Sequence, residues 1–545
     1  MTRPEPHWSS LSKLMPLYRA LTTVSVGDGC TTAFWLDSWL PGGALSIQTS
    51  SLFSHVTSPD VSVAHVVQHG LDGGLARHRL PPSSDKPSRS RVAVIGAGAA
   101  GLAAARELRR EGHAPVVFER AAAVGGTWRY EDSNAADPAD PLGAGGAHSS
   151  LYASLRTNLP RESMGFLDFP FVADRSSADP RRFPGHPEVL RYLEEFARRF
   201  DLLGLVRFET EVVSVRRSRD DGAGAAGWRV SYRSRRPDGA EGELEEDVFD
   251  AVVVCNGHFT EPRVAAIAGI HCWPGKQMHS HNYRVPDRFR GQVVMVIGYQ
   301  PSGMDISRDI AGVAKEVHVA MKSEPPYQMD TTTATGHANL WLHSCTIERA
   351  EEDGSLVFQD GSRIKADVIL HCTGYKYSFP FLGGDDDGEL AGAIFVDDNR
   401  VGPLYKHVFP PILAPHISFI GLPFRTIPFL VFQLQSKWVA GVLSGRLELP
   451  SQEAMMRDVD AFYSDMEARG CPKRRTHDLG QGNLFEYEDW VAEQCGLGRM
   501  EGWRKGMFVA TCKNLADRPN SYRDEWDDDH LLPQAHQDFS KHSCL

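Results

Sequence analysis

Residues 91–108 read Arg-Val-Ala-Val-Ile-Gly-Ala-Gly-Ala-Ala-Gly-Leu-Ala-Ala-Ala-Arg-Glu-Leu, a β-branched run that ends in glycines and continues into a helix-forming stretch. Glycines at this point let the backbone turn sharply and approach a pyrophosphate, while the following helix directs its N-terminal N–H groups at the anion. The segment therefore predicts a dinucleotide cradle. Its residues are Gly96, Ala97, Gly98, Ala99, Ala100 and Gly101.

A second strand, turn and helix of the same kind occupies residues 292–307, which begin Gln-Val-Val-Met-Val-Ile-Gly-Tyr-Gln-Pro-Ser-Gly. A lone glycine-rich turn is a weak signal, but two such units on one chain predict two bound nucleotides. The turn of the second unit consists of Gly298, Tyr299, Gln300, Pro301, Ser302 and Gly303.

The residue that ends the next strand distinguishes the two nucleotides. In the first unit the strand 114–119 ends in Glu119, a carboxylate placed to accept hydrogen bonds from an adenosine ribose. In the second unit the strand 317–322 ends in Lys322, a cation that suits a 2′-phosphate where a carboxylate would repel it. We therefore predict FAD at the first cradle and NADPH at the second.

The composition excludes several classes of protein. The chain has 545 residues, enough for two or three domains with a large core. Its net charge of −12 argues against nucleic acid as a partner, because nucleic-acid binders usually carry an excess of Lys and Arg on one face. Nine cysteines without a Cys-x-x-Cys pair fit a reducing compartment, so we expect the cytoplasm.

The most apolar stretch, residues 410–434, is interrupted by prolines and by Arg425. A membrane-spanning helix needs an unbroken apolar run, so this stretch predicts core strands and loops and no transmembrane segment.

Strands and helices alternate from Arg91 onward, which predicts an α/β protein with two Rossmann-like dinucleotide-binding domains. We expect the NADPH domain to be inserted in a discontinuous FAD domain. The expected ranges are 91–260 for the first part of the FAD domain, 261–364 for the NADPH domain, and 365–541 for the second part with the C-terminal region. In this interpretation the strand within 366–374 returns the chain to the FAD domain.

Residues 1–90 do not continue this pattern, and the Pro- and Ser-rich run 79–90 places a boundary near Lys86. Within 1–86, the stretches 16–29 and 34–43 resemble the region downstream of the reverse transcriptase in plant non-LTR retrotransposons. The resemblance implies an unrelated, poorly ordered extension, and we expect it to have no function of its own.

A constellation between the cradles is more specific. Trp273, Gly275, His279 and Tyr283 follow the spacing aromatic-x-Gly-x-x-x-His-x-x-x-Tyr, which resembles the identifying motif of flavin-containing monooxygenases. Further segments are similar to the flavin-contacting turn, the active-site segment and the Ala-Thr-Gly-Tyr linker of that family. These segments are 125–128, 152–171 and 373–375.

The resemblance implies a reaction and site residues. NADPH would reduce FAD, O₂ would form a C4a-hydroperoxyflavin, and one oxygen atom would pass to a soft nucleophile of a small molecule, a thioether sulfur or an amine nitrogen. Asn158 matches the amide that would hydrogen-bond near the peroxide. Gly126 and Trp128 would contact the flavin, and Thr373 and Gly374 would lie in the linker. The segments 308–318, 434–440 and 522–529 resemble the plant branch that includes glucosinolate S-oxygenases.

Two local features have simpler interpretations. His279 and His281 have metal-ligand spacing, but no Cys or carboxylate stands nearby to complete a tetrahedral set, so no metal is expected. The family resemblance implies a structural role for them beside the nicotinamide cofactor rather than acid–base catalysis. The acidic run 524–530 is interpreted as a solvated tail.

Three alternative functions remain open. A flavin disulfide reductase also has two cradles, but it needs a redox-active dithiol, which this chain lacks. An auxin-forming or Baeyer–Villiger-type flavin oxygenase would use the same folds on a carbonyl substrate. A non-catalytic or NADPH-impaired fusion product is the third, because Gln300 adds bulk and Pro301 removes an N–H group in the second turn.

Overall fold

The structure, a computed structural model, describes residues 89–132, 140–143, 148–218, 227–235, 241–322, 335–382 and 392–541. The chain divides into two units, Met1–Lys86 and Pro87–Leu545. The first unit, with the predicted transposon-like extension, lies outside the described residues, and the fold below is that of the second.

A parallel sheet forms the centre of the first domain. Alternate residues of β1 (Arg91–Ile95) enter two different cores, with Val92 and Val94 on one face and Ala93 and Ile95 on the other. This alternation follows from the two-residue period of a strand. The strand order is β20 (Ile417–Phe419), β7 (Ala251–Val254), β1, β2 (Ala114–Phe118) and β3 (Val206–Arg207).

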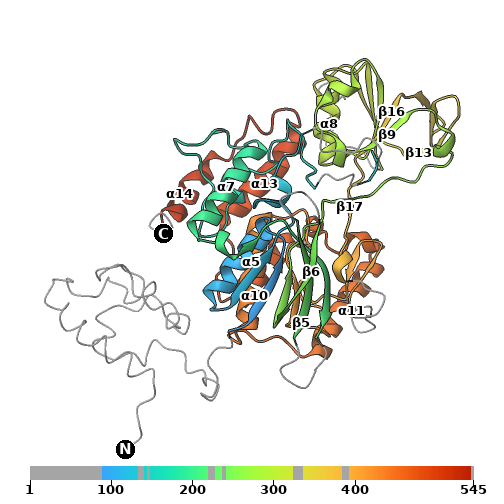
Figure 1. Cartoon of the computed structure of the whole chain (residues 1–545). Helices are drawn as coiled ribbons and strands as arrows, with labels where there is room; N and C mark the ends of the chain where they lie inside the picture. The colour runs from blue at the N-terminus through green and yellow to red at the C-terminus, as the bar shows by residue number, and fades with distance from the viewer. Residues whose placement is uncertain are drawn as a thin grey trace, which may run out of the picture. The chain divides into compact units, whose positions relative to one another are not determined.

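Helices and a second sheet cover these two faces. The Val92 face packs against α5 (Ala99–Arg110) and α10 (Pro428–Leu443), which lie side by side (Figure 1). The opposite face packs against a three-stranded antiparallel sheet. Its strands are β4 (Thr210–Arg217), β5 (Trp228–Arg235) and β6 (Glu241–Phe249).

The second domain repeats this plan. In β10 (Val293–Ile297), Val294 and Val296 face α8 (Ser302–Ala311), whereas Met295 faces a small antiparallel sheet. The parallel sheet has the order β12 (Leu340–His343), β11 (Glu316–Ala320), β10, β16 (Val368–His371) and β9 (Lys276–His279), and the small sheet contains β13 (Ile347–Ala350), β14 (Ser355–Phe358) and β15 (Arg363–Lys365).

Two short strands mark the crossings between the domains. β8 (Glu261–Pro262) leads into the second domain, β17 (Tyr375–Lys376) leads out of it, and the two pair antiparallel. Figure 1 labels β17 on the connection between β16 and the β5–β6 region. The predicted fold class, with one dinucleotide domain inserted in the other, is confirmed.

The predicted return to the first domain at residue 365 is wrong in one respect. β16 pairs with β10 and β9, so it belongs to the second sheet, and the crossing comes at β17. The residues of a four-residue apolar strand do not indicate which sheet the strand joins, and the prediction from sequence therefore assigned β16 to the wrong domain. The first sheet is completed instead by β20.

The apolar stretch 410–434 also differs from expectation in part. It contains β20, as predicted, but α10 begins at Pro428, whose fixed φ suits the first turn of a helix. Among the described residues, no helix is both long and apolar enough to cross a membrane. The remaining α-helices and paired strands are α6 (Arg161–Met164), α7 (His186–Arg199), α11 (Gln452–Ala468), α12 (Leu484–Gln494), α13 (Gly502–Asp517), α14 (Leu532–Ser540), β18 (Phe395–Asp397) and β19 (Arg400–Gly402).

Candidate functional site

The first glycine turn is held by packing of the protein against itself. Gly96 has a φ of +103°, and its N–H donates to the Phe118 carbonyl at 2.8 Å. An ideal Cβ on Gly96 would lie 2.6 Å from the Cys255 carbonyl oxygen, and one on Gly101 would lie 1.8 Å from the Gly96 carbonyl oxygen. Both contacts are impossible, so glycine is required here whether or not a ligand is bound.

Gly98 differs from its two neighbours. Its φ of −74° and ψ of −172° are accessible to any residue, and a Cβ would meet the Gly126 backbone at ordinary contact distances, 3.5 Å from Cα and 3.9 Å from N. Gly126 faces it with a φ of +54°. Within the part of the chain that the structure describes, no contact demands glycine at position 98. An open position at the start of α5 fits a bound pyrophosphate, which would fill the space left by the absence of a side chain at Gly98.

Glu119 lies directly behind this turn and is buried. One carboxylate oxygen accepts the Ala97 N–H at 2.7 Å and the other accepts the Ala121 N–H at 2.8 Å. A carboxylate has about four lone-pair positions, so these two bonds leave acceptors for further donors such as ribose hydroxyls. The residue therefore both braces the turn and suits the role that the sequence predicts for it.

The second turn reproduces the geometry of the first. Gly298 has a φ of +91°, its N–H donates to the Ala320 carbonyl at 2.9 Å, and a Cβ would lie 2.5 Å from the Cys372 carbonyl oxygen. A Cβ on Gly303 would lie 2.1 Å from the Gly298 carbonyl oxygen. The outer glycines of both turns are thus fixed by the same backbone contacts.

The residues between the outer glycines differ. Tyr299 is buried in the core of the second domain, and Gln300 and Pro301 are exposed. Pro301 is the N-cap of α8, so this position lacks an N–H, and Ser302 begins the helix. The Met304 N–H donates to the Tyr299 carbonyl. At the corresponding place in the first turn, the Leu102 N–H donates to the Gly98 carbonyl, one residue further along. The two turns have the same length, but this hydrogen bond spans five residues in the second turn and four in the first.

Lys322 is exposed and follows the end of β11, at the same sheet edge as the second turn. Because the strands of this sheet are parallel, that edge carries the carboxyl ends of β10 and β11, where nucleotides bind in doubly wound folds. The position suits the 2′-phosphate role predicted from the sequence.

Asn158 is exposed, and the residues around it are fixed. The Thr157 N–H donates to the Pro184 carbonyl at 2.9 Å, and the Thr157 hydroxyl donates to the Leu159 carbonyl at 2.9 Å. Trp128, in the turn Gly126–Trp128, packs edge-on against Phe429 in the first turn of α10, with ring centroids 6.3 Å apart.

The motif residues from Trp273 to Tyr283 build the second domain and attach it to its surroundings. Trp273 is buried and donates its ring N–H to the Gly354 carbonyl at 3.0 Å, and its ring lies 2.2 Å from where a Cβ on Gly275 would be. Tyr283 is buried and donates its hydroxyl to Asp309 of α8 at 2.5 Å. The spacing of the motif therefore reflects packing.

His279 is fully buried and both of its ring nitrogens have partners. Nδ1 accepts the His281 N–H at 3.0 Å, so Nε2 carries the proton and donates to the Gly374 carbonyl at 3.1 Å. Burial, with the neighbouring His281 and His371, lowers the pKa of His279 to about 3. The ring is neutral at physiological pH and fixes the linker, where the Thr373 hydroxyl donates to the Arg263 carbonyl. Among the described residues, no group of His, Cys, Asp and Glu has the arrangement of a metal site.

The acidic run 524–530 is solvated as expected at Asp524, Asp527 and Asp529, whose side chains are more than half exposed, but not at Asp528. Asp528 is 3% exposed and forms a two-bond ion pair with Arg182, and Asp524 pairs with Arg156 at 2.8 Å. A run of acids looks solvated in isolation because its arginine partners lie far away in the sequence.

Arg523 was not predicted as a site residue. Its guanidinium donates two hydrogen bonds to Asp305 of α8, at 2.9 and 2.7 Å, and one to the carbonyl of Thr157 at 2.9 Å. The only sequence signal was the resemblance of the segment 522–529 to the plant branch, which names no partner for it.

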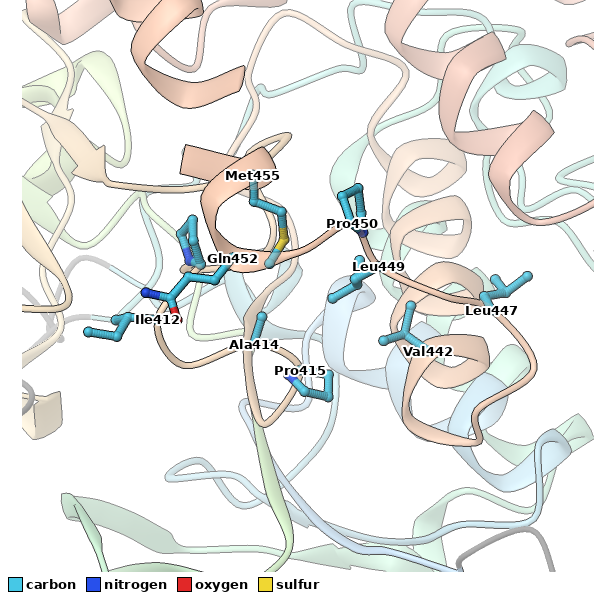
Figure 2. Close-up of a pocket in the computed structure, with 10 residues that line it drawn as sticks. Ile412, Ala414, Pro415, Val442, Leu447, Leu449, Pro450, Gln452 and Met455 are labelled. Atoms are coloured by element: carbon cyan, nitrogen blue, oxygen red, sulfur yellow. The ribbon is translucent and has the colours of Figure 1, made fainter. Parts of the chain in front are cut away.

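An apolar cavity of about 330 Å³ lies away from both turns (Figure 2). It is lined by the loop before β20 and by residues at and beyond the end of α10, including Ile412, Val442, Leu447 and Met455. β20 runs parallel to β7 and β1, so the start of β20 is at the edge of the sheet opposite the glycine turn. Nucleotides bind at the carboxyl edge in such folds, and this cavity therefore plays no part in the cofactor site.

Comparisons with known proteins agree with this geometry. The family described as flavin-binding monooxygenase-like matches residues 89–338 and 341–497. "Flavin-containing monooxygenase FMO GS-OX-like 2" of Arabidopsis thaliana is 56% identical over 470 residues, covering 85% of this chain and 97% of that protein. "Flavin-containing monooxygenase FMO GS-OX5" of the same plant is 54% identical over 471 residues, covering 86% and 98%.

Solved structures are similar as well. The S-allyl-L-cysteine S-oxygenase from Allium sativum superposes with a TM-score of 0.74 at 54% identity, covering 83% of this chain and 99% of that one. Tmm from Pelagibacter sp. strain HTCC7211 has a TM-score of 0.65 at 23% identity, covering 80% and 93%, and shows likeness of fold alone.

Proposed function

We propose that this chain, which belongs to the flavin-binding monooxygenase-like family, transfers one oxygen atom to the sulfur of a small organic thioether. As a member of the family it is a monooxygenase that uses FAD, NADPH and O₂. The observation that carries the choice of sulfur is the match, at 54% identity over 83% of the chain, to an S-oxygenase that acts on S-allyl-L-cysteine.

We assign FAD to the first turn. Gly96 and Gly101 bring the start of α5 close to the end of β1, and Gly98 leaves room for the pyrophosphate. Glu119 would accept hydrogen bonds from the ribose, and Gly126 and Trp128 would border the flavin. The backbone of Ala97, Ala99 and Ala100 completes this site.

We assign NADPH to the second turn. Gly298 and Gly303 place the N-terminus of α8 against the end of β10, where its free N–H groups would meet the pyrophosphate. Lys322 would pair with the 2′-phosphate. Tyr299, Gln300, Pro301 and Ser302 form the rest of the turn, and Thr373 and Gly374 hold the linker beside it.

The proposed reaction needs no general base from the protein. FAD, when bound and reduced by NADPH, would activate O₂, so that one oxygen atom passes to the substrate and the other leaves as water. A thioether sulfur reacts through a lone pair and carries no proton, so no general base is needed. The neutral, fully bonded His279 agrees with this requirement. The task left to the chain is to hold both cofactors, exclude water and offer the Asn158 amide as a hydrogen-bond donor.

A comparison of four oxygen acceptors tests the proposal. Purified FAD-loaded protein is supplied with NADPH, O₂ and, in separate reactions, S-allyl-L-cysteine, N,N-dimethylaniline, cyclohexanone and an α-keto acid, and products are identified by mass spectrometry. We expect the sulfoxide to form fastest. Faster formation of the N-oxide would move the assignment to nitrogen, and a lactone or a decarboxylated acid would favour the carbonyl-directed alternatives.

Asn158→Ala tests the oxygen-transfer step separately. NADPH should still be consumed, but sulfoxide formed per NADPH should fall about tenfold, because a hydrogen bond worth roughly 1 to 3 kcal/mol in a dry site is lost. The NADPH consumed without oxygen transfer should instead yield hydrogen peroxide, measured with a peroxidase-coupled dye. Unchanged coupling would leave Asn158 as a turn residue ahead of Pro160.

A further inference from the structure

The helix α8 carries two acids, Asp305 and Asp309, that accept hydrogen bonds from the segment before Asn158. Asp305 accepts the Tyr152 hydroxyl at 3.2 Å, and Asp309 accepts the Ser154 hydroxyl at 2.9 Å. Tyr152 and Ser154 belong to the segment that leads to Asn158. The helix that begins at the second glycine turn is thus docked on the active-site segment of the other domain.

Arg523 closes this contact from a third part of the chain. It bonds to Asp305 through two N–H groups and, through a third, to the carbonyl of Thr157, the residue before Asn158. Both side chains are largely buried, with 14% of Arg523 and 16% of Asp305 exposed. Burial opposes the charge, but the Asp305 carboxylate raises the pKa of Arg523 above its ordinary value, so the guanidinium stays charged.

The neighbours of Arg523 hold it in place. Its guanidinium lies 4.9 Å from the centroid of the buried Tyr522 ring, which packs edge-on against Phe183. Asp524, the next residue, pairs with Arg156. A guanidinium fixed on both sides can hold two partners in a constant relation, because its donors form a rigid planar fork.

The charge of the pair matters as well. Asp305 lies in the first turn of α8, close to the positive end of the helix that receives the pyrophosphate. An unpaired carboxylate at this point would repel that anion. Arg523 neutralises it without occupying the turn.

We propose that Arg523 is a positioning residue that ties the Asn158 loop to the NADPH-binding helix, so that the oxygen-transfer amide and the second turn keep a fixed relation. The proposal rests on the proposed function for the role of Asn158. The hydrogen bonds of the Arg523 guanidinium go to Asp305 and Thr157, so it acts through these residues. Its loss should therefore disturb the coupling of oxygen transfer and the binding of NADP⁺, while FAD remains bound.

The test compares Arg523→Gln and Arg523→Lys with the parent as full-length, FAD-loaded protein. In Arg523→Gln the dissociation constant of NADP⁺, measured by calorimetry, should rise about five- to tenfold because the Asp305 charge is exposed. The fraction of NADPH electrons released as hydrogen peroxide should rise at least about threefold, and kcat for the thioether should fall about tenfold with KM within roughly twofold.

Arg523→Lys separates charge from position. An ammonium can neutralise Asp305 but cannot also bond to Thr157 in the same geometry. NADP⁺ affinity should stay within about twofold of the parent, whereas peroxide release should still rise. This variant also keeps the test valid if Arg523→Gln does not fold.

Asp527→Asn is the matched control, because Asp527 lies on the same segment, is exposed and pairs only with Arg518, at 3.6 Å, among the ion pairs of the described residues. It should leave both readouts unchanged. Peroxide release that rises equally in the control, or native coupling in both Arg523 variants, would overturn the proposal. If no thioether is oxygenated by the parent but NADP⁺ binding still depends on Arg523, the proposed function fails and the tie between loop and helix stands.

Discussion

The two glycine turns of this protein make the same backbone contacts at their outer glycines but differ in the residues between them. A Cβ added at the last glycine would lie 1.8 Å from a carbonyl oxygen in the first turn and 2.1 Å from one in the second. In both turns that carbonyl belongs to the glycine five residues earlier. Between the outer glycines the first turn has only small residues, and the second has Tyr299, Gln300 and Pro301. The outer glycines are thus required by contacts within the backbone, whereas no such contact fixes Gly98, the position that we assign to the pyrophosphate.

Gly101→Val should have the largest effect. A side chain at this position overlaps the Gly96 carbonyl, so β1 and α5 cannot keep their contact, and we expect a loss of more than about 4 kcal/mol in the free energy of unfolding. Soluble yield and thermal melting measure it. Gly303→Val should do the same in the second turn. A soluble, flavin-loaded Gly101→Val protein would disprove the requirement.

Gly98→Ala should separate folding from binding. The added Cβ comes no closer than 3.5 Å to the Gly126 backbone, so the protein should fold, but the methyl group would occupy the space assigned to the pyrophosphate and FAD should be lost. The absorbance ratio of flavin to protein after purification is the readout. Gly204→Ala, where no atom lies within 4 Å of the added Cβ, is the matched control and should keep its flavin. Full flavin content in Gly98→Ala would remove FAD from this turn.

Replacing Gln300 with Ser and Pro301 with Ala should raise the affinity of the second turn for NADPH. The double change restores one N–H donor and removes bulk, which is worth roughly 1 to 3 kcal/mol, or about five- to over a hundredfold in affinity. Tyr299 is left in place because it is buried in the domain core. The rate of anaerobic flavin reduction against NADPH concentration measures the gain. An unchanged rate would mean that the native turn already binds NADPH well.

Lys322→Glu sharpens the same comparison. It should weaken NADPH more than NADH, because only NADPH carries the 2′-phosphate that the cation would pair with. The ratio of the two dissociation constants is the readout, since a change in folding would lower both affinities equally.

The last prediction concerns acid stability. His279, beside the second turn, is neutral when folded, with a pKa of about 3, and titrates near 6.5 when unfolded. Its contribution is complete above pH 6.5 and is lost as pH falls toward 3, by at most about 1.4 kcal/mol per pH unit. Melting of the parent and of His279→Gln between pH 7 and 4 should show a shallower decline in the variant. Parallel curves would show that other groups set the acid limit.

The sequence predicted the glycine turns because each is local. The contact between Gly96 and Gly101 spans five residues, and the strand, turn and helix that create it are contiguous. Glu119 and Lys322 were found for the same reason, since each follows the strand next to its turn. Their places in the fold agree with the roles expected for them, which remain to be tested in solution.

Tertiary structure alone decided the rest. The strand at 368–371 joined the second sheet, Gly126 came to face Gly98, and the acids at 524 and 528 found Arg156 and Arg182, all through contacts between residues distant in the chain. Arg523 gained its role in the same way, from Thr157 and Asp305. A local pattern fixes backbone conformation because neighbouring residues restrict one another, but the partner of a short strand or a charged side chain depends on which segments the complete fold brings together.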